Sequence, residues 1–322
     1  MDSQVTLVSK DYLFDGMILP TNVYLRLTEN SYIHIGIKGT SAQFSQLKSY
    51  QNNQSQVFVL TKEKSLLMDF ISSLTNKIIT NDSVAVDRKA LFIQELVEDT
   101  LEGVVKSNFA SLDRMQSVGN LLVKLSKQIP NIDKAIEIMQ QQKNTESRHP
   151  MTTCLISMMI AEEAGVLSPL NQDKLAAGAL LHDVGLRFVD ESILNRPRET
   201  WSLEELSLYE QHPMKGAEML RRVEGMSVEV LLIIAEHHEN AIGTGFPKKI
   251  RDVRMNPLSK IVALANCFTE LILSESSKSY TPDEAIQYID QVLGQPFNKG
   301  LFSNLKNIIN SSRLEAKIKK AS

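Results

Sequence analysis

The spacing of apolar residues along the chain changes near residue 63. Before that point, apolar and polar residues alternate in short runs rich in Val, Ile and Tyr, which predicts β-strands. The runs are 5–8, 22–27, 32–37 and 56–60. Between the last two runs, residues 42–50 are expected to form a short helix. We therefore predict that residues 1–62 form a small α+β module.

After residue 63, apolar residues recur every three or four positions, which is the period of an amphipathic helix. Leu67, Phe70 and Leu74 mark the first such helix. Further helices are predicted at 86–125, 131–142, 151–164, 174–181, 204–220 and 228–238. We expect residues 63–130 to be a helical connector, which either packs against the rest of the chain or forms a homodimer. Residues 131–322 are predicted to be all α, so the protein as a whole is mainly α.

The composition is that of an ordinary globular protein, with 43% hydrophobic and 23% charged residues in a chain of 322. Its formal net charge of −3 argues against binding to nucleic-acid polymers, which requires a basic face. The first residues do not form a basic segment followed by an apolar core, and no apolar run is long enough to span a bilayer. We therefore expect a cytoplasmic protein without a membrane span.

Five of the six histidines lie between residues 149 and 238, each on or beside a predicted helix. They are His149, His182, His212, His237 and His238. Helical bundles build metal centres from side chains on successive helices that converge in the core. An adjacent pair such as His182 and Asp183 is, on its own, more often a structural feature. The clustering of the other histidines around it nevertheless predicts a metal site.

Asp183 suggests what this site does, because a carboxylate can offer one oxygen to each of two metal ions. Such a bridge is typical of two-metal hydrolases, in which a water held between the ions attacks phosphorus. The nitrogen-rich ligand set predicts two divalent transition-metal ions, with iron preferred and manganese next, although zinc and nickel also bind imidazole. Asp183 is accordingly the candidate catalytic residue.

Four motifs of this region resemble one known family. They are His182-Asp183 with Gly185, then Ile193-Leu194-Asn195-Arg196-Pro197, His212-Pro213 with Gly216-Ala217, and His237-His238-Glu239 with Gly243-Thr244-Gly245-Phe246-Pro247. In order and spacing they are similar to the HD-GYP family of HD-superfamily phosphodiesterases, which hydrolyse the bacterial second messenger cyclic di-GMP to linear pGpG. The resemblance covers about residues 145 to 305 and implies an HD-type helical bundle. The strand-rich module before it is similar to the accessory domain of some members.

The resemblance also implies a ligand for each metal ion. His149, His182 and Asp183 correspond to ligands of the first metal, and Asp183 bridges to a second metal that His212, His237 and His238 complete. The family's second aspartate on the first metal falls at Asn266, a neutral and weaker ligand, which Glu270 one turn later partly replaces. The glutamate that some members use for a third metal falls at Thr145, so only two metals are expected.

Other positions depart from the family pattern. Leu186 stands where a lysine is usual, Ile242 where an aspartate precedes the Gly-x-Gly turn, and Phe246 where the signature tyrosine lies. Lys260 replaces an arginine that faces the phosphate. We predict that Lys260 binds substrate, and we include Arg196 as a second candidate anion contact.

Two functions remain open on these residues. The first is a metal-dependent phosphodiesterase acting on cyclic di-GMP, with a rate reduced by the loss of the lysine at Leu186. The second is a catalytically impaired protein that senses cyclic di-GMP, or that binds a signalling partner through the altered loop Gly243–Pro247. The changes at Leu186, Ile242 and Asn266 motivate the second reading.

Overall fold

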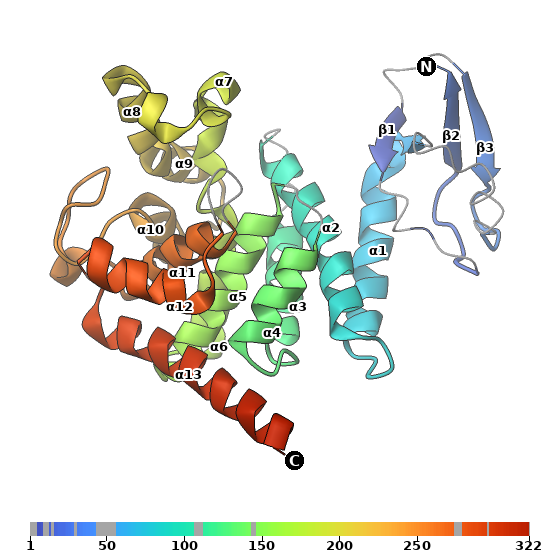
Figure 1. Ribbon diagram of the computed structural model, residues 1–322. Helices are drawn as coiled ribbons and strands as arrows, with labels where there is room; N and C mark the ends of the chain where they lie inside the picture. The colour runs from blue at the N-terminus through green and yellow to red at the C-terminus, as the bar shows by residue number, and fades with distance from the viewer. Residues whose placement is uncertain are drawn as a thin grey trace. The chain divides into compact units, whose positions relative to one another are not determined.

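The computed structural model in Figure 1 describes residues 5–8, 13, 16–28, 31–42, 56–105, 112–142, 146–273, 279–294 and 296–321. The chain forms two compact units, Met1–Leu96 and Val97–Ser322. Residues 43–50 of the short helix expected at 42–50, as well as Thr145, lie outside the described residues. The expected three-part division at 62 and 130 stays a prediction.

The first unit contains a four-stranded antiparallel sheet in the order β1-β4-β2-β3. Its strands are β1 (Val5–Val8), β2 (Val23–Thr28), β3 (Ser31–Gly36) and β4 (Val57–Leu60). These are the strands predicted from the alternation of apolar residues, within one residue at each end. In β2 the alternation has a direct structural cause, because Val23 and Leu25 are buried while Tyr24 and Arg26 are partly exposed. The short turn η4 (Thr61–Glu63) then leads from β4 into α1 (Lys64–Ile79).

The described residues of the second unit form helices and turns and no strand. Its helices are α2 (Val86–Val105, which begins in the first unit), α3 (Leu112–Ser126), α4 (Ile132–Gln141), α5 (Arg148–Glu163), α6 (Pro169–Leu181), α7 (Glu191–Leu194), α8 (Leu203–Glu210), α9 (His212–Leu220), α10 (Val228–Glu236), α11 (Pro257–Ile272), α12 (Pro282–Gln287) and α13 (Lys299–Ala321). The short turns η6 (Val184–Phe188), η7 (Arg198–Thr200), η8 (Asp252–Arg254) and η9 (Tyr288–Val292) lie between them. The predicted class, a small α+β module followed by a helical bundle, is confirmed.

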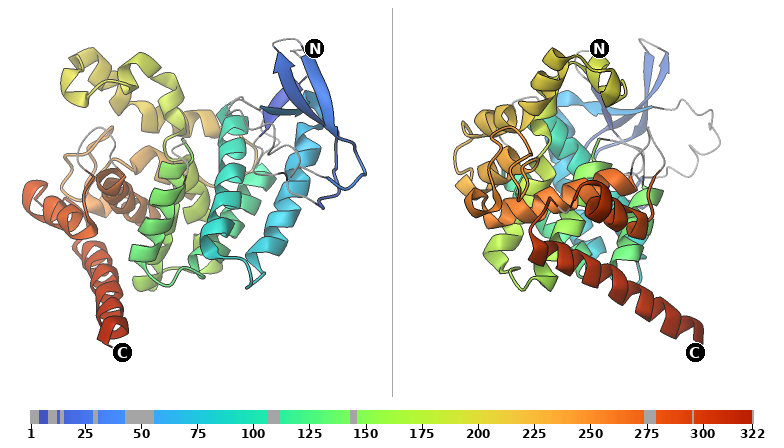
Figure 2. Two further views of the ribbon diagram at one scale, coloured as in Figure 1. Left: turned by 45° about the vertical axis from the view of Figure 1, so that its right-hand side comes forward. Right: turned by 60° about the vertical axis from the view of Figure 1, so that its left-hand side comes forward.

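The core of this unit forms around α5, which packs against α3, α4, α6, α11 and α13 (Figures 1 and 2). Its sequence from Pro150 to Met158 is buried at every position. A helical stretch that is buried on all sides is expected at the centre of a bundle, whereas the amphipathic α4 covers it with one face. No helix in the described part of the chain has the length and apolar character needed to cross a bilayer.

The helix predicted at 204–220 is in fact two helices, since α8 ends at Glu210 and α9 begins at His212. Pro213 is the physical reason. A proline has no N–H to donate to the carbonyl four residues earlier, and its ring clashes with that carbonyl in a continuous helix. The break therefore frees the carbonyl of Tyr209 and turns His212 towards the centre of the bundle. The helix predicted at 228–238 likewise ends earlier, at Glu236.

The turn η6 lies unusually close to α9, and glycines make this approach possible. A Cβ atom added to Gly185 would lie 1.9 Å from the backbone oxygen of His212 and 2.9 Å from the backbone nitrogen of Gly216. One added to Gly216 would lie 3.0 Å from the backbone nitrogen of Gly185. Two backbones therefore touch here, directly after Asp183 and at the beginning of the helix that carries His212.

We predict that Gly185→Ala destabilises the helical unit by about 3 kcal/mol or more, because the new methyl group meets backbone atoms that cannot rotate away. Urea unfolding can be followed through the fluorescence of the single tryptophan, Trp201, which lies in this unit. Gly103→Ala is the matched control, since its Cβ atom would meet nothing within 4 Å. That helical substitution should leave stability unchanged or raise it by up to about 1 kcal/mol. Equal stability of the two variants would contradict the close contact.

Candidate metal centre

The predicted ligand residues come from helix ends that meet in the bundle. His149 lies in the first turn of α5, His182 and Asp183 directly follow α6, and His212 begins α9. His237 and His238 follow the last residue of α10, and Asn266 lies in the middle of α11. The structure brings all seven residues of this set together.

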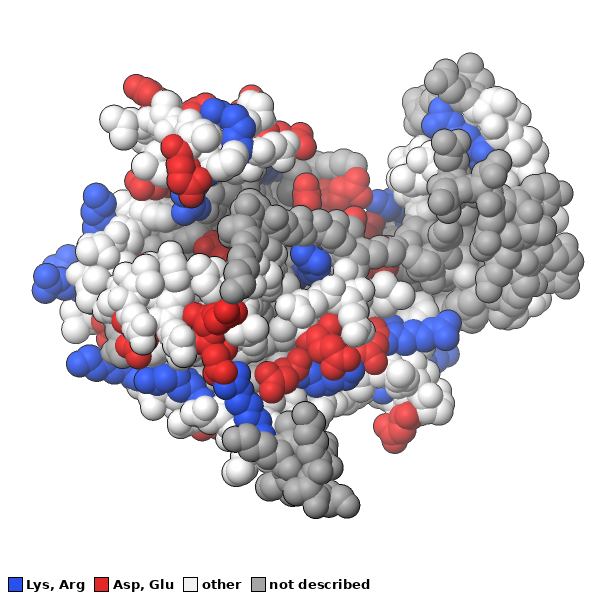
Figure 3. Space-filling view, viewed as in Figure 1, with Lys and Arg blue, Asp and Glu red and all other residues white. Residues whose placement is uncertain are grey.

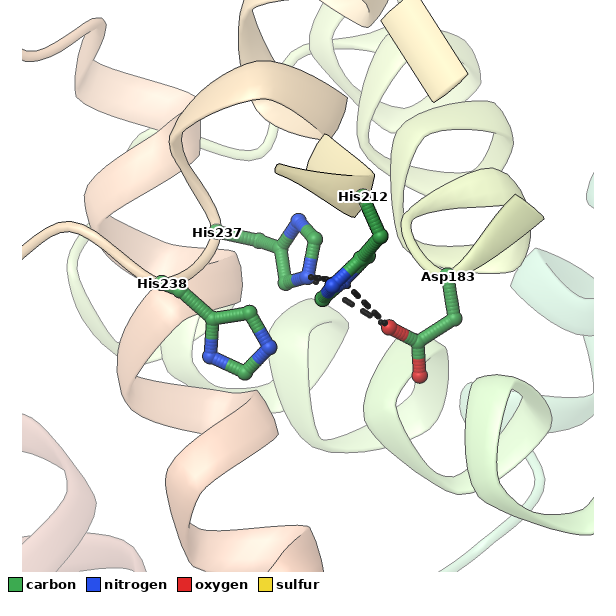
Figure 4. A group of neighbouring side chains, drawn as sticks. All are labelled: Asp183, His212, His237 and His238. Carbon is green, nitrogen blue, oxygen red and sulfur yellow. Dashed lines mark hydrogen bonds and ion pairs between the residues drawn. The ribbon is translucent and has the colours of Figure 1, made fainter. Parts of the chain in front are cut away.

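Asp183 stands between two groups of imidazoles. One carboxylate oxygen, Oδ1, lies 3.3 Å from His212 Nε2 and 3.4 Å from His237 Nε2. The other, Oδ2, lies 3.1 Å from His182 Nε2 and 3.5 Å from His149 Nε2. Figure 4 shows the first of these groups, with the ring of His238 completing it. Asp183 is thus shared by two sets of candidate ligands. Within each set, the ligand atoms lie within 4.8 Å of one another.

Three of the imidazoles are oriented by a carbonyl three residues earlier. The Nδ1 atoms of His182, His212 and His237 lie 2.7 Å, 2.7 Å and 2.8 Å from the backbone oxygens of Ala179, Tyr209 and Ile234. A carbonyl can only accept, so each Nδ1 carries the proton and donates it. In a neutral ring the Nε2 atom then has a free lone pair, and all three lone pairs point into the cluster.

This arrangement fits a cation and is unfavourable without one. His212 Nε2 and His237 Nε2 are 3.1 Å apart, and both face Asp183 Oδ1. With Nδ1 already protonated, none of these three atoms has a proton to share in the neutral form. Lone pairs at such distances repel one another, whereas a metal ion among them would accept electron density from all three.

Most of the pKa shifts favour the metal-binding form of the side chains. His182 is the exception, because burial lowers its pKa but the Asp183 carboxylate outweighs burial and raises it above 6.5. Burial lowers the pKa of His149 and His237 to about 4, although Asp183 partly offsets the shift. Burial first and His237 second also lower the pKa of His238 well below 6.5. Burial raises the pKa of Asp183, but the imidazoles around it, His182 foremost, outweigh burial and bring the pKa well below 3.8. Neutral imidazole and ionised carboxylate are the states in which these groups bind a metal.

Asn266 turns its oxygen towards the cluster. Its Oδ1 lies 2.8 Å from His149 Nε2, and its Nδ2 donates to Glu270 Oε1 at 3.3 Å. Glu270 therefore orients the amide and places a carboxylate next to it. The Glu270 side chain remains exposed, but desolvation by the surrounding atoms, and then the Asp183 carboxylate, raise its pKa to about 7.

Lys260 and Arg196 are not part of this cluster. Lys260 Nζ pairs with Asp252 Oδ2 at 3.1 Å and lines a separate pocket together with Lys174 and Glu229. Arg196 forms an ion pair with Glu205 near the surface. The predicted substrate-binding roles of both residues remain predictions, and each side chain already has a carboxylate partner.

The loop Gly243–Pro247 folds back onto the cluster. The ring of Phe246 stacks on His238 with centroids 4.4 Å apart and an angle of 26° between the rings. A Cβ atom at Gly245 would lie 2.3 Å from the backbone oxygen of His238, so only glycine fits there. The buried Glu239 carboxylate accepts hydrogen bonds from the backbone nitrogens of Lys248 and Ile250, which fixes the end of the loop.

Two residues beside the cluster had no strong signal in the sequence. Tyr209 packs against His212, with centroids 4.9 Å apart, and its hydroxyl lies 3.4 Å from His238 Nε2. Its position three residues before His212 could have indicated this contact, because such residues share a helix face. The guanidinium of Arg198 lies over the Tyr209 ring, 4.3 Å from its centroid. Nothing in the local pattern around Arg198 predicts it.

Charged side chains of both signs are mixed on the surface of the helical unit. On the face drawn in Figure 3, Lys and Arg side chains lie among Asp and Glu side chains rather than in one broad basic area. On this face, an anion therefore has to be attracted by the candidate site itself.

The part of the chain that contains the cluster matches a known protein family. The family model for the HD domain matches residues 132–298, which include every predicted ligand. The chain is similar to a cyclic di-GMP phosphodiesterase of Pseudomonas aeruginosa, with 29% identity over 43% of this chain and 33% of the relative. It is also similar to the cyclic di-GMP phosphodiesterase PdeB of Borreliella burgdorferi, with 25% identity over 56% of this chain and 48% of the relative.

Among solved structures, the fold is similar to Bd1817, described as an HDG"Y"P protein from Bdellovibrio bacteriovorus. The TM-score is 0.70 at 22% identity, over 95% of this chain and 99% of that one. The chain spans half or less of the length of the two curated relatives. Because the HD domain match covers more than half of its residues and contains the four motifs, the chain belongs to the HD domain family, within its HD-GYP group.

Proposed function

We propose that this protein is a two-metal phosphodiesterase that hydrolyses cyclic di-GMP to linear pGpG. The observation that carries the proposal is the position of Asp183, whose two oxygens face two separate groups of imidazole nitrogens. The substrate is inferred from the relatives, since those of P. aeruginosa and B. burgdorferi are named cyclic di-GMP phosphodiesterases. The proposal includes a cytoplasmic location, because this messenger acts inside the cell.

The cluster divides naturally into two sets of ligands. One ion would be held by His149, His182, Asp183 and the Oδ1 atom of Asn266, and the other by Asp183, His212, His237 and His238. A ligand set made mostly of histidine nitrogens, with one carboxylate shared between the two ions, favours iron first and manganese next. When bound, such a pair of ions makes water nucleophilic at neutral pH and stabilises the charge that develops on the phosphoryl oxygens.

The residues of the chain contribute orientation and protonation state. Hydrolysis joins a water oxygen to phosphorus and breaks one bond between phosphorus and a ribose oxygen, which leaves with a proton. The backbone carbonyls of Ala179, Tyr209 and Ile234 keep the Nε2 lone pairs aimed at one place, so the site needs little reorganisation during the reaction. Phe246 stacks on His238 and covers one face of its ring.

A second function, a sensor that binds cyclic di-GMP without cleaving it, rests on specific substitutions. Compared with the family pattern, Leu186 takes the place of a cationic lysine and Phe246 lacks the hydroxyl of a tyrosine. Asn266 offers a neutral ligand where the family has an anionic aspartate. In that case the exposed Ile242 and the loop Gly243–Pro247 would form a surface for a signalling partner. Such a partner and a homodimer remain part of this proposal. Binding of substrate by Lys260 or Arg196 would require either side chain to leave its carboxylate partner.

The metal content of Asp183→Ala tests the shared ligand. Wild-type protein purified without added metal should contain about two transition-metal ions per chain by elemental analysis. Asp183→Ala should lose both ions, because it removes the only ligand common to the two sets. Asp173→Ala, an exposed aspartate of α6, is the control and should keep both. Wild-type protein that stays empty after reconstitution with iron or manganese would overturn the metal site.

Asn266→Asp tests the weakened ligand. We expect an anionic oxygen to slow the release of the first metal to a chelator by about tenfold, which corresponds to about 1.4 kcal/mol. The control Asn195→Asp adds the same charge at an exposed position and should not change the rate. Equal release rates in the wild type and Asn266→Asp would show that Asn266 is not a ligand.

Turnover distinguishes the enzyme from the sensor. Metal-reconstituted protein should cleave cyclic di-GMP slowly, with the product separated by chromatography. Leu186→Lys should raise the rate about ten- to a hundredfold, because a charge-assisted contact to phosphate contributes about 1.5–3 kcal/mol. Leu203→Lys, at a residue 83% exposed, adds the same charge elsewhere and should have no effect. Tight binding without product in the wild type and Leu186→Lys alike would assign the protein to the sensor class.

A further inference from the structure

Arg198 presents a guanidinium beside the candidate metal centre without a carboxylate partner. Its Cζ atom lies 4.3 Å from the centroid of the Tyr209 ring and 5.6 Å from that of Trp201. Among the residues described by the structure, no carboxylate lies within ion-pair distance of Arg198. Arg196, two residues earlier, contrasts with it because its guanidinium is already paired with Glu205.

The segment that carries Arg198 is held in place by its neighbours. The Trp201 Nε1 atom donates to the backbone oxygen of Arg196 at 3.1 Å, and the Thr200 hydroxyl donates to that of Pro197 at 2.7 Å. Contact with the faces of two aromatic rings further limits the positions that the guanidinium can take. Because so much of this order exists before any ligand arrives, binding an anion here costs little conformational entropy.

Arg198 is also close to the half of the cluster that contains His212 and His238. The Tyr209 ring on which it lies contacts His212, and the Tyr209 hydroxyl is 3.4 Å from His238 Nε2. A ligand that lies over His212 and His238 therefore comes close to the guanidinium of Arg198.

The chemistry of a cyclic dinucleotide matches this arrangement. Its ring contains two phosphodiesters, and only one of them can lie at the histidine cluster at a time. The other carries a negative charge that the cluster leaves unmatched, and a guanidinium is the side chain best suited to bind a phosphate through two parallel hydrogen bonds. We propose that Arg198 binds this second phosphate and so positions the dinucleotide for cleavage of the first. The inference rests on the proposed function and adds a substrate-binding residue to it.

The test compares two substrates. Cyclic di-GMP has two phosphodiesters, whereas bis(4-nitrophenyl) phosphate has one and nothing for Arg198 to hold. In metal-reconstituted protein, Arg198→Gln should lower kcat/KM for cyclic di-GMP about ten- to a hundredfold and leave that for bis(4-nitrophenyl) phosphate unchanged. Arg198→Lys should recover part of the loss. Arg222→Gln, which removes an exposed arginine two residues after the end of α9, should leave kcat/KM for both substrates unchanged.

Calorimetric binding of cyclic di-GMP separates this proposal from the proposed function. If the wild type binds the dinucleotide but does not cleave it, hydrolysis fails as a function, and weaker binding by Arg198→Gln than by Arg222→Gln still supports the role of Arg198. Equal binding and equal kcat/KM in Arg198→Gln and the wild type would overturn it. A loss of the same size on bis(4-nitrophenyl) phosphate would also overturn it, because Arg198 would then act on the reacting phosphate or on the fold. If the wild type neither binds nor cleaves cyclic di-GMP, both proposals fail.

Discussion

The arrangement of the site depends on hydrogen bonds from histidine Nδ1 atoms to backbone carbonyls at the ends of helices. The last carbonyls of a helix have no partner within it. In α6, α8 and α10, one carbonyl of the last turn accepts a proton from the imidazole three residues later. Each bond satisfies a buried backbone group and at the same time fixes the tautomer of the ring. Convergence of the free Nε2 atoms on Asp183 follows from where the helices end.

The ends of these helices are in turn set by local sequence and by packing. Pro213 divides what would otherwise be one helix, and this division releases the Tyr209 carbonyl for His212. The contact of Gly185 with the backbone of His212 then brings η6 against α9, so that Asp183 and His212 lie side by side. His149 lies in the first turn of α5, directly before the stretch Pro150–Met158 that is buried at every position. The site is therefore a product of the bundle rather than of one loop.

Much of this could be predicted from sequence, and the failures have physical reasons. Alternation and helical period indicated the strands and the helical class, because burial on one face leaves a clear pattern. Histidines spaced along successive helices indicated a cluster. The break before His212 was missed, since the apolar period continues across Pro213. Lys260 lies six residues before Asn266, which turns it by roughly 240° around α11 and towards Asp252, and its predicted contact with the phosphate stays a prediction. Arg198 reaches the cluster only through tertiary packing, which no local pattern records.

The neutral amide at Asn266 has a consequence for what the site retains. A carboxylate there would cancel part of the charge of two divalent cations, whereas an amide leaves the cluster one charge more positive. Linear pGpG carries more negative charge than cyclic di-GMP, because cleavage turns a diester into a terminal monoester. Compared with a cluster that has an aspartate at this position, the more positive cluster gains more affinity for the product than for the substrate. Under the proposed function, the neutral amide at Asn266 therefore shifts the balance of binding from the cyclic substrate towards the linear product.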